Sequence, residues 1–379
     1  MAVDVETRIV SQWATIYDAV YTTDGSHDEP DFAGWRSSIT GENYAAAETA
    51  EWLHGTVAEI GALRPRSVLD VGAGSGLVVR ELLSTVDEYV AVDISATAVE
   101  RMSRTYGSRP GTRFLVRAAD EIADLGPAGS RFDVVVFNSV IHHFPGVEYL
   151  RRVIGRAASV GRTVFLGDVH SLPLRDALRL CALAVRAPGP LTAGRVRGWL
   201  DNQDAREREL ILDPGFFVDV AAEHGLVADV RLKPGRHGTE MNLFRYDVRL
   251  RPSSDRHLDP ASLRRIPWRG AVEPVPQVLT GIPHPGLAPS VRALETVRRL
   301  DAAESVDVAE LLAAPAGDGI APADLRVEVE RHGLTCYCVP STEPGRYDAV
   351  IAEGRWDGVT WTTGPADDRP AANRPALQQ

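Results

Sequence analysis

A turn with three closely spaced glycines is the first stretch of the sequence that could bind a ligand. Residues 67–76 read Ser-Val-Leu-Asp-Val-Gly-Ala-Gly-Ser-Gly, which predicts a buried strand and a tight turn before a helix over 77–83. Such a unit presents backbone amides to a nucleotide-like ligand in a doubly wound sheet. A dinucleotide fingerprint has glycines at positions one, three and six, whereas Gly72, Gly74 and Gly76 fill positions one, three and five. The spacing therefore disfavours a nicotinamide dinucleotide.

A strand-borne Asp70 before this turn resembles motif I of class I methyltransferases, which bind S-adenosyl-L-methionine (AdoMet) and release S-adenosyl-L-homocysteine. Asp93 closes the next predicted strand, where an acidic residue binds ribose hydroxyls. Ile94 is expected against adenine, Asp120 at the adenine amino group, and Asn138 near the methionine part. The predicted cofactor-binding residues are Asp70, Gly72, Ala73, Gly74, Asp93, Ile94, Ala119, Asp120 and Asn138.

Titratable side chains follow two central predicted strands, at the edge where open α/β sheets bind ligands. His142 and His143 follow the fourth strand, and Asp168 ends the fifth. The methyl group of AdoMet is already activated, so an enzyme must hold a nucleophile in line with the S–CH₃ bond in a dry site. An amine must lose a proton, a carbon acid needs a strong base, and a carboxylate needs none. The predicted catalytic residues are His142 and His143 as bases, since imidazole titrates near working pH, and Asp168 as a group that orients a histidine or binds an ammonium. Helix-capping or packing roles are the structural alternative for all three.

Aromatic and hydroxyl residues of the first sixty positions could close over the bound molecules. A helix is predicted over 5–22, followed by a polar segment at 24–31 and a loop at 31–41 that is rich in small residues. The predicted substrate-binding residues are Tyr17, Tyr21, Trp35, Ser38, His170 and Glu240.

The elements that position these residues alternate between strand and helix, which predicts an α/β fold with a parallel sheet. Strands are expected over 67–71, 89–93, 113–117, 132–137, 162–166, 226–232 and 242–250, and helices over 48–63, 77–83, 96–106, 148–158, 174–185 and 214–224. We expect three parts: an N-terminal helical cap (1–63), a seven-stranded Rossmann-like core (64–250) with a lid insertion at about 188–210, and a C-terminal part (251–379). The last part is expected to hold a linker arm over 251–289, a small α/β subdomain and a disordered tail of about fifteen residues.

Several blocks together resemble the methyltransferase domains inserted in nonribosomal peptide synthetases. They are residues 31–41, the motif I block, and residues 133–145, 167–173, 207–217 and 232–248. The resemblance implies an AdoMet-dependent methyltransferase of natural-product biosynthesis whose substrate is a small molecule, free or tethered to a carrier protein. His142-His143 stands where that family usually has Gln-Tyr. The chain begins at a methionine and contains no adenylation or carrier sequence, so we expect a free-standing relative.

Composition limits the partners. The chain has 379 residues and a formal net charge of −11, which disfavours a nucleic-acid or anionic membrane surface. No signal peptide or membrane-spanning run is found, and three cysteines form no metal pattern, so a cytoplasmic protein without a metal is expected. Cys336 and Cys338 are expected on one buried face of a strand.

The sequence leaves the acceptor open. N-methylation of an amino acid or aminoacyl group is favoured, with O-methylation of a carboxylate or hydroxyl and C-methylation as alternatives on the same fold. A non-catalytic AdoMet-binding subunit and a nicotinamide oxidoreductase are the readings from other classes; the glycine spacing disfavours the oxidoreductase.

Overall fold

The computed structural model describes residues 2–22, 31–32, 34–126, 130–254, 256–315, 317–361 and 370–375. The polar segment predicted at 24–31 therefore lies outside the described residues, except for Asp31. No helix within these ranges is long and apolar enough to cross a membrane.

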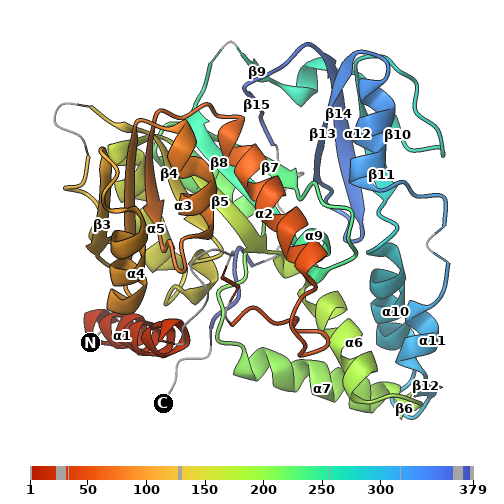
Figure 1. The fold of residues 1–379 in the computed structure, drawn as a ribbon. Helices are drawn as coiled ribbons and strands as arrows, with labels where there is room; N and C mark the ends of the chain where they lie inside the picture. The colour runs from red at the N-terminus through yellow and green to blue at the C-terminus, as the bar shows by residue number, and fades with distance from the viewer. Residues whose placement is uncertain are drawn as a thin grey trace.

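A seven-stranded sheet forms the centre of the molecule (Figure 1). Its order is β3-β2-β1-β4-β5-β8-β7; the first five strands are parallel, and β8 is antiparallel to both neighbours. The strands are β1 (Ser67–Val71), β2 (Glu88–Asp93), β3 (Thr112–Val116), β4 (Phe132–Asn138), β5 (Gly161–His170), β7 (Leu226–Leu232) and β8 (Arg245–Pro252). The predicted Rossmann-like seven-stranded core is confirmed.

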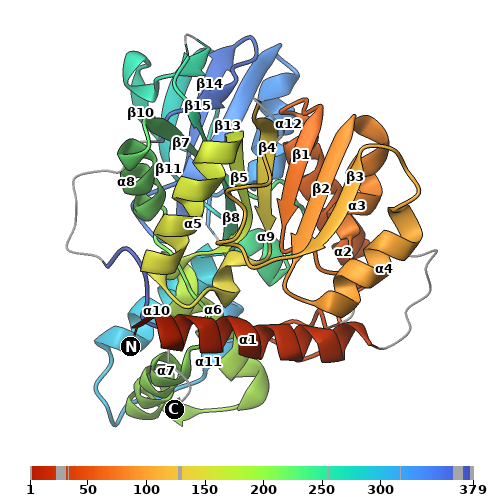
Figure 2. The ribbon, with the colours of Figure 1, turned by 90° about the vertical axis from the view of Figure 1, so that its left-hand side faces the viewer.

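Helices cover both faces of this sheet because each has one apolar stripe. On α5, Leu150, Val153, Ile154 and Ala157 recur at helical spacing and are fully buried. One face carries α2 (Ala46–Gly61), α3 (Leu77–Leu82) and α4 (Ala96–Tyr106), and the other carries α5 (Val147–Val160) and α8 (Gly215–Glu223). The first helix, α1 (Ala2–Tyr21), runs across the end of the sheet instead (Figure 2).

The segment after β5 forms a helical layer with part of the C-terminal region. It comprises α6 (Arg175–Arg186) and α7 (Ala193–Arg206), which pack against α10 (Ala288–Arg299) and α11 (Val308–Leu312). A short antiparallel pair, β6 (Leu191–Thr192) with β12 (Ser305–Val306), joins the two halves. The region predicted as a lid is thus held by residues that follow it by about a hundred positions.

A second, four-stranded sheet lies beside the core and differs from the prediction. Its order is β10 (Arg265–Pro267), β11 (Gln277–Pro283), β14 (Arg346–Glu353) and β13 (Leu334–Pro340), with α12 (Pro322–Glu330) packed on β13. The linker arm predicted over 251–289 is wrong, because β11 is an inner strand of this sheet. Its buried Val278, Leu279 and Ile282 supply the packing, although flanking prolines hid the strand in the sequence. Cys336 and Cys338 are buried on β13, as expected.

Smaller elements link these layers. They are α9 (Glu240–Leu243), β9 (His257–Leu258) paired with β15 (Gly358–Val359), and 3₁₀ turns at Leu83–Thr85, Ile141–His143, Leu172–Leu174 and Pro260–Ser262.

The described part of the tail is ordered, contrary to the prediction of disorder. Ala372 forms a bridge with Leu212. The Asn373 amide oxygen accepts from the Ile211 N–H at 2.7 Å, and its NH₂ group donates to the Glu209 carbonyl at 2.8 Å. Residues 370–375 therefore hold the segment that follows α7.

Candidate active site

A cavity of about 390 Å³ opens where the parallel strands end, beneath α1. This is the edge of an open α/β sheet at which ligands bind. Most of the predicted site residues line it: Tyr17, Tyr21, Trp35, Asp70, Gly72, Ala73, Gly74, Asp93, Ile94, Ala119, Asn138, His142 and His143. Asp120 and Asp168 lie outside this lining, and Ser38, His170 and Glu240 line an adjoining cavity.

The glycine turn has the backbone conformation that its sequence demands. Gly72, Gly74 and Gly76 have φ of 75°, 54° and 82°, which side-chain-bearing residues rarely adopt. A Cβ built on Gly74 would lie 2.7 Å from the Tyr21 hydroxyl, and one on Gly72 would lie 2.4 Å from Val140. The turn is therefore a bare backbone surface with neighbours close above it.

Asp93 ties this turn to the next strand. One carboxylate oxygen accepts from the Gly74 N–H and the other from the Ser95 N–H, each at 2.8 Å. Burial raises the pKa of Asp93. Asp70 accepts from the Tyr89 hydroxyl at 2.8 Å, and burial raises its pKa to about 7.

Helix α1 is fastened over the cavity at its C-terminal end. Asp18 accepts from the Ser95 hydroxyl at 2.6 Å and from the Thr97 N–H at 3.1 Å, at the start of α4. This contact turns Tyr17 and Tyr21 of α1 toward the cavity. The sequence revealed the aromatic stripe but not the aspartate that docks it.

The polar groups that line the cavity match those of AdoMet. The carboxylate of Asp93 is placed to accept from ribose hydroxyls, and the side-chain oxygen of Asn138 is buried without a partner in the described structure. A Cβ on Gly167 would lie 2.2 Å from that oxygen, so the glycine leaves room for this amide. A buried oxygen without a partner is costly, and a ligand N–H would satisfy it.

A cluster of histidines forms the other end of the cavity. The rings of His142 and His143 have centroids 4.0 Å apart, and His142 stacks on His170 at 4.6 Å with an interplanar angle of 11°. His143 Nε2 lies 2.5 Å from the Tyr17 hydroxyl. The Nδ1 atoms of His142 and His143 have no partner within the described residues.

Glu209 completes this cluster and was missed by the sequence analysis. It lies in the loop after α7, half-buried, with a carboxylate oxygen 3.3 Å from His170 Nδ1. It lines both the main cavity and the adjoining one. The only sequence signal was an acidic residue inside a block shared with a known family.

Burial sets the protonation of this end. It lowers the pKa of His143 to about 4 and lowers that of His142 well below its usual value. Burial acts to raise the pKa of Glu209, but the hydrogen bond from His170 opposes it and the pKa is lowered. Two neutral imidazoles therefore face one ionised carboxylate, and the expectation that these histidines titrate near working pH is wrong.

Asp168 does not touch the histidines that it was predicted to orient. Strand β5 continues past the predicted end at Leu166, and Asp168 lies inside it at a φ of 64°. It is fully buried, and its carboxylate accepts hydrogen bonds or forms ion pairs with Trp52, Ser139, Lys233 and Arg245. Burial acts to raise its pKa, but Arg245 and Lys233 lower it. These partners give Asp168 a structural position behind the cavity.

Two other predicted residues are also held by protein partners. Asp120 accepts from the Tyr149 hydroxyl at 2.9 Å and pairs with Arg156 at 3.2 Å. Glu240 is buried and accepts from the Ser38 N–H at 2.8 Å and from its hydroxyl at 3.0 Å. Glu240 thus anchors the 31–41 loop.

The histidine cluster also has the composition of a metal site. One donor atom each from His142, His143 and Glu209 lie within 4.8 Å of one another. Two imidazoles and a carboxylate suit a first-row divalent ion, and they equally suit a ligand with several N–H groups.

Comparison with known proteins places these features in a class. Residues 69–161 match the family model described as "Methyltransferase domain". The chain therefore carries a methyltransferase domain, and AdoMet is its methyl donor.

Over more of its length the chain is similar to segments of very large proteins. It is 33% identical over 287 residues to a probable nonribosomal peptide synthetase of Salinispora arenicola, covering 73% of this chain and 4% of that protein. It is 34% identical to the chondramide synthase of Chondromyces crocatus, covering 64% of this chain and 6% of that one. The chain is an AdoMet-dependent methyltransferase that is similar to segments of these synthetases, and it spans less than a tenth of these two relatives.

Solved structures with a similar fold include two methyltransferases. The magnesium protoporphyrin IX methyltransferase of Synechocystis has a TM-score of 0.40 and 15% identity, over 65% of this chain and 97% of that one. The N-methyltransferase NodS of Bradyrhizobium japonicum has a TM-score of 0.40 and 10% identity, over 64% of this chain and 98% of that one.

Proposed function

We propose that this chain transfers the methyl group of AdoMet to the amino nitrogen of a small amino compound, such as an amino acid or aminoacyl group. When bound, AdoMet supplies an electrophilic methyl group on a sulfonium. The task of the chain is then to hold a nucleophile in line with that methyl group and to exclude water.

The histidine cluster is the observation that carries this proposal. The Glu209 carboxylate is a hydrogen-bond acceptor on one wall of the cavity, and the unpartnered Nδ1 atoms of His142 and His143 are acceptors in the tautomer that carries the proton on Nε2. An amine brings N–H groups that match them. A carboxylate acceptor brings only lone pairs and a negative charge, which Glu209 would repel.

The lowered pKa values refine the role of the histidines. A group with a pKa of about 4 is a weak base toward an ammonium ion, because each unit of mismatch costs about 1.36 kcal/mol. We therefore assign His142 and His143 to binding and orienting the amine, with His143 fixed by Tyr17. The neutral amine becomes a methylammonium as it takes the methyl group and then loses a proton to solvent, and Glu209 supplies the negative charge that offsets this cation.

A product analysis tests the proposal. The purified chain is incubated with methyl-labelled AdoMet and a panel of amino acids, aminoacyl thioesters, hydroxy acids and carboxylic acids. We expect N-methyl products, and turnover that is unchanged after treatment with EDTA. Methyl esters or methyl ethers as the main products would overturn the assignment to nitrogen, and loss of turnover on chelation would assign the cluster to a metal ion.

A further inference from the structure

A second cavity of about 300 Å³ adjoins the main one under α6 and α7. The two share Arg36, His142, Glu209 and Arg245 in their linings, so they meet at the histidine cluster. We call the second cavity the arginine chamber, because it is also lined by Arg175, Arg179 and Arg186.

Three of the five arginines of this chamber are already neutralised. Arg175 pairs with Asp204 at 2.5 Å, and Arg179 pairs with Glu207 at 3.0 Å. Arg245 pairs with Asp168 at 2.5 Å, as described above. These ion pairs compensate three of the guanidinium charges. Glu209 and Glu240 also line the chamber, where Glu209 contacts His170 and Glu240 pairs with Arg245.

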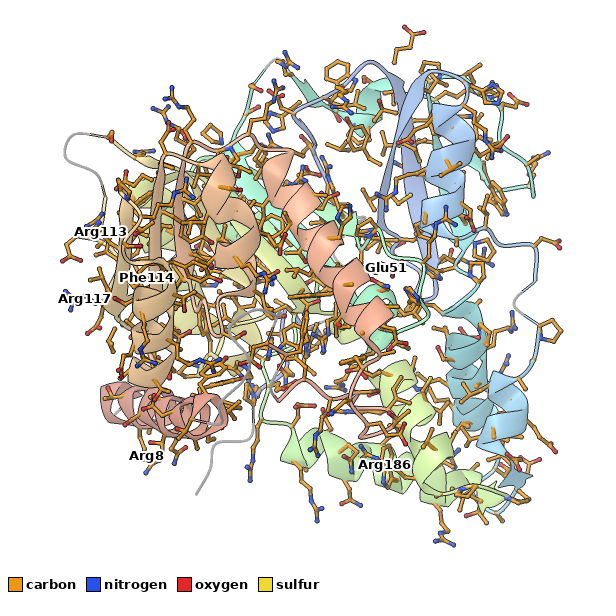
Figure 3. All side chains as sticks on the ribbon, viewed as in Figure 1. Arg8, Glu51, Arg113, Phe114, Arg117 and Arg186 are labelled. Carbon is orange, nitrogen blue, oxygen red and sulfur yellow. The ribbon has the colours of Figure 1, made fainter. Side chains whose placement is uncertain are left out.

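The other two arginines are not neutralised. The Arg36 guanidinium has no hydrogen bond or ion pair within the described residues. Arg186, at the end of α6 (Figure 3), donates only to the Ser38 carbonyl at 2.8 Å. Arg36 follows Trp35 in the 31–41 loop that Glu240 anchors through Ser38, so both cations are connected to the same loop. Two guanidiniums without a carboxylate partner favour an anionic ligand.

We propose that the arginine chamber binds an anionic group of the methyl acceptor through Arg36 and Arg186, while the amine lies at the junction beside His142 and Glu209. This inference rests on the proposed function. The acceptor is then an amino compound with an anionic end, and that anion is either the carboxylate of a free amino acid or the phosphate of a pantetheine arm. Leu178, Trp199 and Phe244 of the same lining are apolar, and they would contact a side chain or an alkyl chain of the acceptor.

The test compares three forms of one amino acid with labelled AdoMet: the free acid, its methyl ester, and its 4′-phosphopantetheine thioester. The ester lacks an anion, so it should be methylated with a KM raised roughly ten- to a hundredfold over the best anionic form, as expected for a lost charge-assisted bond. Which anionic form is preferred identifies the source of the charge.

Arg36→Ala and Arg186→Ala should each raise the KM of the preferred anionic form at least about tenfold and leave that of the ester unchanged. Arg195→Ala, on the exposed side of α7, is the matched control. Calorimetric titration of the same compounds into the protein with S-adenosyl-L-homocysteine gives a readout that is independent of turnover. An ester used as well as both anionic forms, or both variants matching Arg195→Ala, would overturn the proposal.

A hydroxy acid keeps the two proposals separate. If a hydroxy acid is methylated and its amino analogue is not, the proposed function fails. If the KM of that hydroxy acid still depends on Arg36, the proposed anion site is supported even though the proposed N-methylation is not.

Discussion

At the cofactor end of the main cavity the buried titratable groups are carboxyls, whereas at the acceptor end they are imidazoles. Burial disfavours the charged form of both, so it raises the pKa of Asp70 to about 7 and lowers that of His143 to about 4. The pKa values of carboxyls and histidines are thus shifted in opposite directions, and both shifts favour the neutral form.

The difference between the two ends lies in how charge is compensated. Asp93 is held by two backbone N–H groups, that of Gly74 in the glycine turn and that of Ser95 just after β2. Glu209 is held by a histidine side chain and by a loop that residues of the chain's end secure. In the function proposed here, the cofactor is recognised through local backbone, and the acceptor through side chains brought together from distant segments.

The largest expected effect comes from removing the ionised carboxylate at the acceptor end. Glu209→Gln should lower kcat/KM by about 10²- to 10³-fold, the usual loss for one electrostatic group at a reacting centre. AdoMet affinity should stay within about twofold, because Glu209 is not among the residues assigned to the cofactor. Steady-state kinetics and calorimetry measure the two quantities. Glu223→Gln on α8 is the control, since its carboxylate pairs with Arg151 on the surface; equal activity of the two variants would contradict the assignment.

Acidification should change the stability of the fold in opposite directions through the two ends of the cavity. The pKa of Asp70 is higher in the folded chain, so its protonation stabilises the fold as pH falls from 7 toward 4. The pKa of His143 is lower in the folded chain, so protonation of the unfolded chain destabilises the fold as pH falls from 6.5 toward 4. The two contributions reach up to about 4 and about 3 kcal/mol at 1.36 kcal/mol per unit.

When one of the two groups is substituted, the pH dependence of stability should show the contribution of the group that remains. Asp70→Asn should lose stability more steeply than wild type on acidification, and His143→Gln less steeply. Urea unfolding at pH 7, 5.5 and 4.5 measures the slopes. Parallel profiles for wild type and both variants would show that burial does not shift these groups.

A smaller effect is expected at the cofactor end. Asp93→Ala should raise the AdoMet dissociation constant at least about tenfold, since it removes a charged acceptor for two ribose hydroxyls. Turnover at saturating AdoMet should change little. Calorimetry on Asp93→Ala beside Asp87→Ala, whose carboxylate pairs with Arg66 on the surface, measures the change. Equal affinities in the two folded variants, or binding of NAD in place of AdoMet, would refute the assignment.

The smallest effect should come from the residue that secures the Glu209 segment. Asn373→Ala removes two hydrogen bonds to that segment, and we expect a loss of about two- to tenfold in kcat/KM with unchanged AdoMet affinity. Asn202→Ala on the exposed face of α7 is the control. A loss of thermal stability without a change in kinetics would limit Asn373 to a structural role.

The glycine turn and the place of Asp93 at the end of β2 could be predicted from the sequence because these residues are local. Strand, glycine turn and Asp93 follow one another within about 25 positions, and each has a conformational signature, such as positive φ at Gly72 and Gly74. Periodicity likewise located all seven core strands, with ends that differ by a few residues.

The acceptor end could be predicted only in part. His142 and His143 were visible because they follow a central strand. Glu209 was not, because it lies in a loop whose position depends on α7 and on Asn373. Asp168 was assigned wrongly to a histidine because nothing local shows that β5 extends to His170 or that Arg245 would arrive from β8. The strand β11 was missed because the prolines that flank it outweighed its short apolar run.

The hydrogen bonds between Asn373 and the Glu209 segment also bear on the order in which the protein folds. They join residues more than 160 positions apart, so their formation must close a long loop. The pairing of β1 with β2 joins residues only about 20–25 positions apart, so these two strands leave the ribosome close together in time. We expect the AdoMet-binding half to form early during synthesis, and the acceptor wall to mature only after the last residues of the chain have emerged.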